Sequence, residues 1–92
     1  MNVMSSEFQK SKALKVLIRS KNKTFFDGVC YSVSSMNDVG EFDILSEHAN
    51  FVTLIKNKII IDKSMDSEKT ISIDNKAVLN IINNQVDVYL GV

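Results

Sequence analysis

The sequence predicts an all-β protein, an antiparallel β-sandwich of about eight to ten short strands. Apolar and polar residues alternate with a period of two in several stretches, which is the spacing of a half-buried strand. Short polar segments rich in Asn, Asp and Lys separate these stretches, and Asn and Asp favour turns. No segment shows a helical period over a length that would form a stable helix.

The predicted strands follow one another closely along the chain. The segments that fit a strand are residues 14–19, 29–34, 51–55, 59–61, 70–74 and 86–90. Residues 77–82 are the one candidate helix, but the segment is too short to be helical alone and continues the rhythm of the strands. A sandwich of short strands joined by tight turns is therefore the simplest arrangement.

The turns predicted between these strands contain no proline, because the chain has none. They lie at residues 21–23, 37–40, 56–58, 66–67, 74–76 and 83–85. Asn and Asp tolerate a positive φ angle, so they can close a hairpin where glycine is absent.

The length of 92 residues suits one domain. We expect residues 1–12 to be a flexible leader and residues 13–92 to form the single sandwich. The lone cysteine, Cys30, excludes an intrachain disulfide and is interpreted as buried and inert. One cysteine and one histidine, His48, cannot form a zinc site within the chain unless carboxylates supply the remaining ligands, and we expect neither a metal nor a cofactor.

The charges balance overall, with 11 cations and 11 acids, but they are unevenly spread. Residues 1–23 hold six cations and one acid, and the remainder is acidic. The basic segment could attract phosphate or anionic lipid, although a solvated arm and strand is the favoured interpretation. The overall balance argues against a nucleic-acid partner, and apolar runs of at most three residues are too short to span a membrane.

Two groups of residues invite a catalytic interpretation. Ser46, Glu47 and His48 include a nucleophile, an acid and a base, but adjacent side chains project in different directions, whereas a triad must converge. Glu41 and Asp43 would share one face of a strand, where two carboxylates are commonly just solvated. We therefore expect no enzymatic activity, and a binding or mechanical role.

Residues 40–49 read Gly-Glu-Phe-Asp-Ile-Leu-Ser-Glu-His-Ala. This stretch resembles a motif of the epsilon subunit of F-type ATP synthases, Gly-Glu-(Leu/Phe)-Gly-Ile-Leu-Pro-x-His-Ala-Pro, which lies in the N-terminal β-sandwich of that family. Further similarities lie in the family's order at residues 14–16, 23–28, 71–73 and 78–88. The family has a Phe-x-Gly turn at the position of residues 23–28. Asp43 replaces a glycine, and Ser46 and Asn50 replace prolines, all exchanges that turns accept.

The resemblance implies a non-catalytic central-stalk (rotor) subunit of a proton-translocating ATP synthase. Its partners would be the gamma subunit and the c-ring, with the catalytic head contacted indirectly and the membrane reached only through the complex. The location would be the cytoplasmic side of the inner membrane, or the organelle equivalent. The family continues into a C-terminal helical hairpin, which we expect this chain, ending at Val92, to lack.

The resemblance also assigns roles to individual residues. The loop with Asp38, Gly40, Glu41 and Phe42 would face the c-ring, with Glu41 as a charge-assisted contact; a solvated turn acid is the equally weighted alternative. Phe42 would be core by its alternation with Ile44. The remaining motif residues would be structural: Gly28, Ile44, Leu45, His48 and Ala49.

His48 is expected to make a hydrogen bond within its loop rather than to sense pH. For the whole chain, the alternative function is a free-standing β-sandwich interaction module with a different partner.

Overall fold

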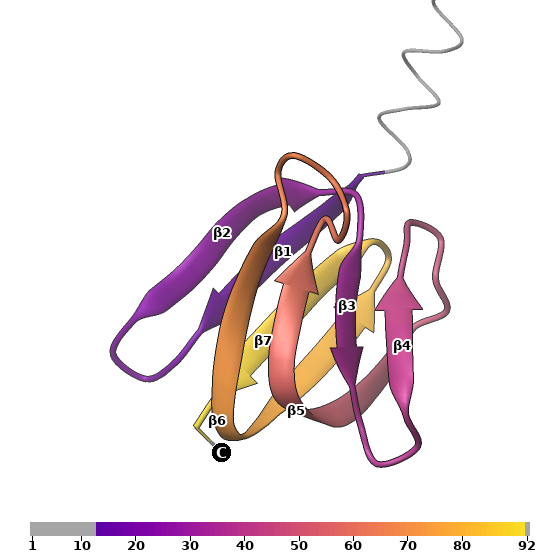
Figure 1. Ribbon diagram of the computed structural model, residues 1–92. Helices are drawn as coiled ribbons and strands as arrows, with labels where there is room; N and C mark the ends of the chain where they lie inside the picture. The colour runs from indigo at the N-terminus through magenta and orange to yellow at the C-terminus, as the bar shows by residue number, and fades with distance from the viewer. Residues whose placement is uncertain (1–12, 92) are drawn as a thin grey trace, which may run out of the picture.

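A computed structural model describes residues 13–91, which form seven strands and no helix (Figure 1). The strands are β1 (Leu14–Arg19), β2 (Thr24–Cys30), β3 (Val33–Met36), β4 (Glu41–Ile44), β5 (Phe51–Ile61), β6 (Lys69–Ile82) and β7 (Gln85–Leu90). No helix of this part of the chain is long and apolar enough to cross a membrane. The predicted leader, residues 1–12, lies outside the described residues.

The strands form one continuous sheet in the order β2-β1-β7-β6-β5-β3-β4. This sheet folds over on itself into two layers (Figure 1). β1, β2 and β7 lie in one layer, β3 and β4 lie in the other, and the long strands β5 and β6 connect them. Five of the six strand pairings are antiparallel, and β1 and β7 pair in parallel. The predicted all-β sandwich is confirmed, with one parallel pair where the first and last strands of the chain meet.

The number of strands is seven rather than eight to ten, because two predicted turns are bulges inside long strands. Partners of β5 jump from Lys76, opposite Lys56, to Ile73, opposite Asn57, which leaves two residues of β6 unpaired. Asn57 has a φ of 73°, so the residue expected to close a hairpin instead bends a strand. Residues 51–61 and 69–82 therefore each form one bent strand, and the bends fold the sheet over.

The strand predicted at residues 29–34 is also divided differently in the structure. It is not one strand, because β2 ends at Cys30 and β3 begins at Val33. The chain crosses here from one layer to the other. Asp62, after β5, holds this crossing, since its Oδ1 accepts hydrogen bonds from the backbone N–H groups of Tyr31 (2.6 Å) and Ser32 (3.2 Å). Asp62 is buried, and Ser67 Oγ donates to its Oδ2 at 2.7 Å.

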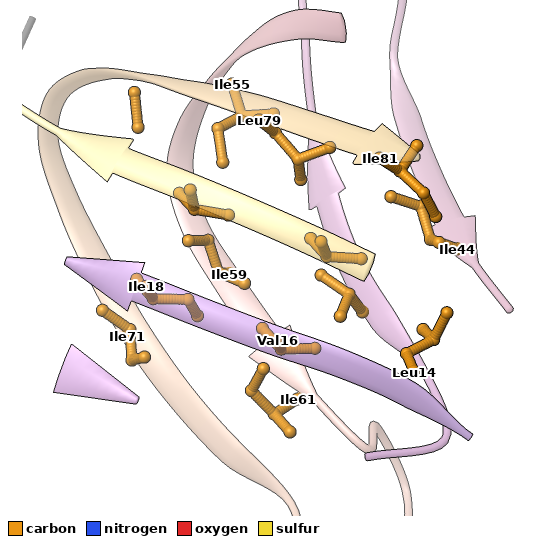
Figure 2. Close-up of a cluster of buried hydrophobic side chains, with 14 of the residues drawn as sticks. Leu14, Val16, Ile18, Ile44, Ile55, Ile59, Ile61, Ile71, Leu79 and Ile81 are labelled. Atoms are coloured by element: carbon orange, nitrogen blue, oxygen red, sulfur yellow. The ribbon is translucent and has the colours of Figure 1, made fainter. Parts of the chain in front are cut away.

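The core lies between the two layers (Figure 2), and every strand contributes side chains to it. On β1, Leu14, Val16 and Ile18 point inward, and they face a group of isoleucines from β5 and β6. The fully buried large side chains are Leu14, Val16, Ile18, Val33, Ile44, Ile55, Ile59, Ile61, Leu79, Ile81, Val86 and Val88. Each such side chain contributes about 1.5–3 kcal/mol by leaving water, which makes the alternation the main determinant of the fold.

Cys30 is buried at the edge of this core, as predicted. Burial, and secondarily the charge of Asp62, raises the pKa of its thiol to about 11. The thiol is therefore protonated at neutral pH, and its Sγ lies 3.4 Å from the carbonyl oxygen of Ser32.

Candidate partner-binding site

The turn between β3 and β4 extends at one end of the sandwich (Figure 1), and with the first residue of β4 we call it the β3–β4 tip (residues 37–41). Asn37 N–H donates to Gly40 O at 3.0 Å, and Gly40 N–H donates back to Asn37 O at 3.2 Å. The side-chain Oδ1 of Asn37 also accepts from the N–H of Val39 (2.9 Å) and of Gly40 (3.2 Å). These bonds make an Asx turn, which restrains the backbone of the tip.

Two side-chain contacts tie the β3–β4 tip to β5. Lys56 Nζ lies 3.1 Å from Asp38 Oδ1, and Asn37 Nδ2 donates to Thr53 Oγ1 at 3.2 Å. Hydrogen bonding and attraction to Lys56, with a further contribution from Lys76, lower the pKa of Asp38 below its ordinary value. The ion pair is exposed, so it contributes little to folding stability. Its main effect is local, because it neutralises one of the two acids at the tip.

Glu41 and Phe42 point to opposite sides of β4. Glu41 is exposed and forms no ion pair with any other residue of the described chain. Phe42 is half-buried, packs against the core and meets Phe51 edge to face, with ring centroids 5.9 Å apart. Of the four residues expected to face a partner, Asp38, Gly40 and Glu41 lie on the surface of the tip, whereas Phe42 belongs mainly to the core.

The other motif residues lie at the opposite end of β4 or far from it. Ile44 is fully buried and Leu45 is exposed. His48 Nδ1 lies 2.8 Å from the carbonyl oxygen of Ala49, and the imidazole packs on Phe51 with centroids 5.1 Å apart. His48 thus makes a hydrogen bond within its own loop.

Gly28 corrects the expectation of a Phe-x-Gly turn. It lies inside β2, where it pairs with Val16, and its φ is not in the positive range. A Cβ there would approach the Phe26 ring at 3.5 Å, which is ordinary van der Waals contact. The turn lies earlier, before β2 begins at Thr24.

Of the three adjacent residues considered for catalysis, Glu47 and His48 make hydrogen bonds that hold their loop. Glu47 N–H donates to Asn84 Oδ1 at 2.6 Å, and Asn84 Nδ2 donates to the Glu47 carboxylate at 3.2 Å. No hydrogen bond connects Ser46 to His48 in residues 13–91, so the contact between nucleophile and base is not formed. Within the same residues, no three His, Cys, Asp or Glu side chains gather as a metal site would require.

A surface that sequence reasoning missed lies on the outer side of β5, β6 and β7. Val52 and Leu54 on β5 are 63% and 52% exposed. Leu54 lies opposite Val78, and Val78 lies opposite Tyr89, so apolar side chains form a row across three strands. We call Val52, Leu54, Val78 and Tyr89 the outer face. Alternation along β5 could have revealed its apolar residues, but the strand order was needed to place them side by side.

Residues 13–90 match the family model of the ATP synthase delta/epsilon chain, β-sandwich domain. The chain belongs to this family. The resemblance found in residues 40–49 is therefore confirmed. A curated relative, the ATP synthase epsilon chain of Sulfurimonas denitrificans, is 30% identical over an alignment of 81 residues, and the match covers 79% of this chain and 62% of the relative. The chain thus spans less than two thirds of the length of that epsilon chain.

Two solved structures contain chains with the same fold. A chain in the mitochondrial ATP synthase of Euglena gracilis (OSCP/F1/c-ring) matches with a TM-score of 0.75 and 10% identity, over 87% of this chain and 51% of that one. A chain in the central stalk and c-ring of the Tetrahymena thermophila mitochondrial enzyme matches with a TM-score of 0.65 and 11% identity, over 86% and 63%. At these identities the likeness concerns the fold.

Proposed function

We propose that this delta/epsilon-type sandwich is a non-catalytic central-stalk subunit of a proton-translocating F-type ATP synthase. In this role it links the gamma subunit to the c-ring and so couples proton flow to ATP synthesis. The family match over residues 13–90 carries the proposal. The epsilon chain of the curated relative and the central-stalk and c-ring assembly of the Tetrahymena structure support it. The subunit would be peripheral, on the cytoplasmic side of the inner membrane or the organelle equivalent.

The c-ring would bind the β3–β4 tip, through Asp38, Gly40 and Glu41. The tip is suited to this because it extends at one end of the sandwich (Figure 1) and is held by its own hydrogen bonds. The carboxylate of Glu41 is exposed and unpaired within the described chain, so it can form a charge-assisted hydrogen bond to a basic side chain of the ring.

The gamma subunit would bind the outer face. Stable interfaces have an apolar centre with a polar rim, and the outer face has this composition. Leu54, Val78 and Tyr89 form its centre, while Arg19, whose guanidinium lies 5.8 Å from the Tyr89 ring centroid, lies at its margin. A sandwich with a dry, closely packed core is stiff enough to transmit torque between the two partners.

Titration of the full chain against the gamma subunit of its source organism tests the first contact. We expect one-to-one binding that Leu54→Ser weakens by about tenfold or more, since an apolar side chain is lost from the interface centre. Val29→Ser is the matched control, because Val29 is also exposed but lies on β2 outside the outer face. Absence of binding by the unaltered chain would favour an interaction module with a different partner.

The second contact is tested by adding the c-ring to the gamma complex. Glu41→Lys is expected to weaken attachment to the ring while leaving gamma binding and the melting temperature nearly unchanged. Equal loss of folding and attachment would contradict the assignment of Glu41.

A further inference from the structure

We propose that Val39 is the apolar anchor of the β3–β4 tip, that Asn37 holds it in its docking position, and that Glu41 rather than Asp38 supplies the charge. The inference rests on the proposed function, because it specifies how the tip would meet its partner. It predicts a partner surface with a shallow apolar recess next to one cation. In the proposed function that surface belongs to the c-ring.

Val39 is unusual among the apolar residues of the described chain. Its side chain is 96% exposed, more than that of any other large hydrophobic residue there. Val29, the next most exposed valine, is 67% exposed. An apolar side chain at the end of a projecting turn gains nothing from the fold of its own chain, whereas burial against a partner removes nearly all of its surface from water.

Asn37 restrains the segment that presents Val39. Its single side chain makes hydrogen bonds in two directions, accepting from the N–H groups of Val39 and Gly40 and donating to Thr53 on β5. The turn is thereby fixed to the sheet before any partner arrives. Such preorganisation reduces the entropy lost on binding, so Asn37 is a positioning residue.

The two acids at the tip differ in their availability. Asp38 is paired with Lys56 at 3.1 Å, and Lys76 also acts on its charge. Glu41 has no ion-pair partner within residues 13–91, although Lys58 and Lys63 line the same hollow of about 310 Å³ beside β4. A cation on a partner would therefore meet Glu41 as the acid of the tip that holds no ion pair within the described chain, whereas Asp38 already holds Lys56.

The test is equilibrium binding of the full chain to a detergent-solubilised assembly of gamma and c-ring, with gamma alone as the reference. Val39→Ser is expected to weaken binding to the assembly by about tenfold, and binding to gamma alone by less than about twofold. Val29→Ser is the matched control and should bind like the unaltered chain. Glu41→Gln should weaken binding several-fold and reduce its salt dependence, whereas Asp38→Asn should have a smaller effect on both.

The role of Asn37 is tested by a pair of variants. Asn37→Ala should weaken binding by several-fold and speed amide hydrogen exchange at Val39 and Gly40. Asn37→Asp should restore most of the binding at high salt, because its carboxylate can accept the same two N–H bonds and a bond from the Thr53 hydroxyl, while salt screens the added charge. A purely stabilising role would instead lower the melting temperature in both variants without this rescue.

The outcomes distinguish a failure of the details proposed for the tip from a failure of the proposed central-stalk function. If Val39→Ser binds like the unaltered chain while Glu41→Gln is weakened, the anchor is wrong and the proposed function stands. If Asp38→Asn and Glu41→Gln weaken binding equally, the division of charge is wrong. If the unaltered chain does not bind the assembly or gamma, the proposed function itself is wrong.

Discussion

Polar and acidic residues lie at both ends of β4, but at one end an acid stays without an ion pair in the described chain and at the other the side chains bond to each other across the chain. At one end is the β3–β4 tip (residues 37–41). At the other is what we call the closed end, residues 45–50 together with Asn83 and Asn84. In the closed end, polar side chains bond across the chain, with Glu47 joined to Asn84 and the N–H of Asn83 donating to Asn50 Oδ1 at 2.9 Å.

The tip directs its internal hydrogen bonds mainly to its own backbone and to β5. This leaves an exposed valine and an exposed glutamate free. The comparison teaches that a turn rich in polar residues is not by itself a binding site. What distinguishes a docking turn is that its shape is secured without using the side chains that would contact a partner.

The largest effect is expected in the strand that joins the two ends. Ile44→Ala should lower the free energy of unfolding by about 2–5 kcal/mol, because Ile44 is fully buried and its loss leaves a cavity. Chemical denaturation measures this. Leu45→Ala is the control, because Leu45 follows Ile44 directly but its side chain is exposed, so its loss should change the free energy of unfolding little. A small effect of Ile44→Ala would mean that β4 is only loosely joined to the core.

An intermediate effect is expected at the closed end. Asn84→Ala should cost about 1–3 kcal/mol, because Asn84 has a φ of 65° and bonds to Glu47 through both side-chain atoms. Asn84→Gly keeps the backbone conformation and loses only those bonds, so it should cost less. Thermal unfolding of both variants separates the two contributions, and equal losses would show that strain plays no part.

Glu41 and Glu47, exposed glutamates near opposite ends of β4, offer a sharper comparison with a smaller expected effect. Glu41→Ala should leave the melting temperature nearly unchanged, since its side chain has no hydrogen-bond partner in the described chain. Glu47→Ala should lower it measurably, because Asn84 loses an acceptor. The reverse order would contradict the distinction between a free and a closed end.

The smallest effect concerns pH. Because the pKa of Asp38 is lowered by Lys56, its ion pair stabilises the fold above the ordinary pKa of 3.8, and this contribution is lost as the pH falls through the lower folded value. NMR titration of the Asp38 carboxyl should show a pKa below 3.8, and Lys56→Met should raise it towards that value. An unchanged pKa in the variant would show that Lys76 is the dominant partner.

Much of this fold could be predicted from local patterns. The inward residues of β1 and β7 follow the alternation, and the Asn83–Asn84 turn follows from the tolerance of asparagine for positive φ, which is 49° and 65° here. The bulges at Asn57 and opposite it on β6 could not be predicted. Asn favours a hairpin turn and a bulge for the same reason, and only the packing of the sheet decides between them.

The sequence by itself determined the period of the strands, the family and the presence of an acidic loop, because alternation and motifs are properties of neighbouring residues. The tertiary structure decided the parallel pairing of β1 with β7, the row of apolar residues on the outer face, and which acid of the tip is free. Each depends on residues far apart in the chain, as when Lys56 neutralises Asp38. Such contacts arise only when folding brings the strands together.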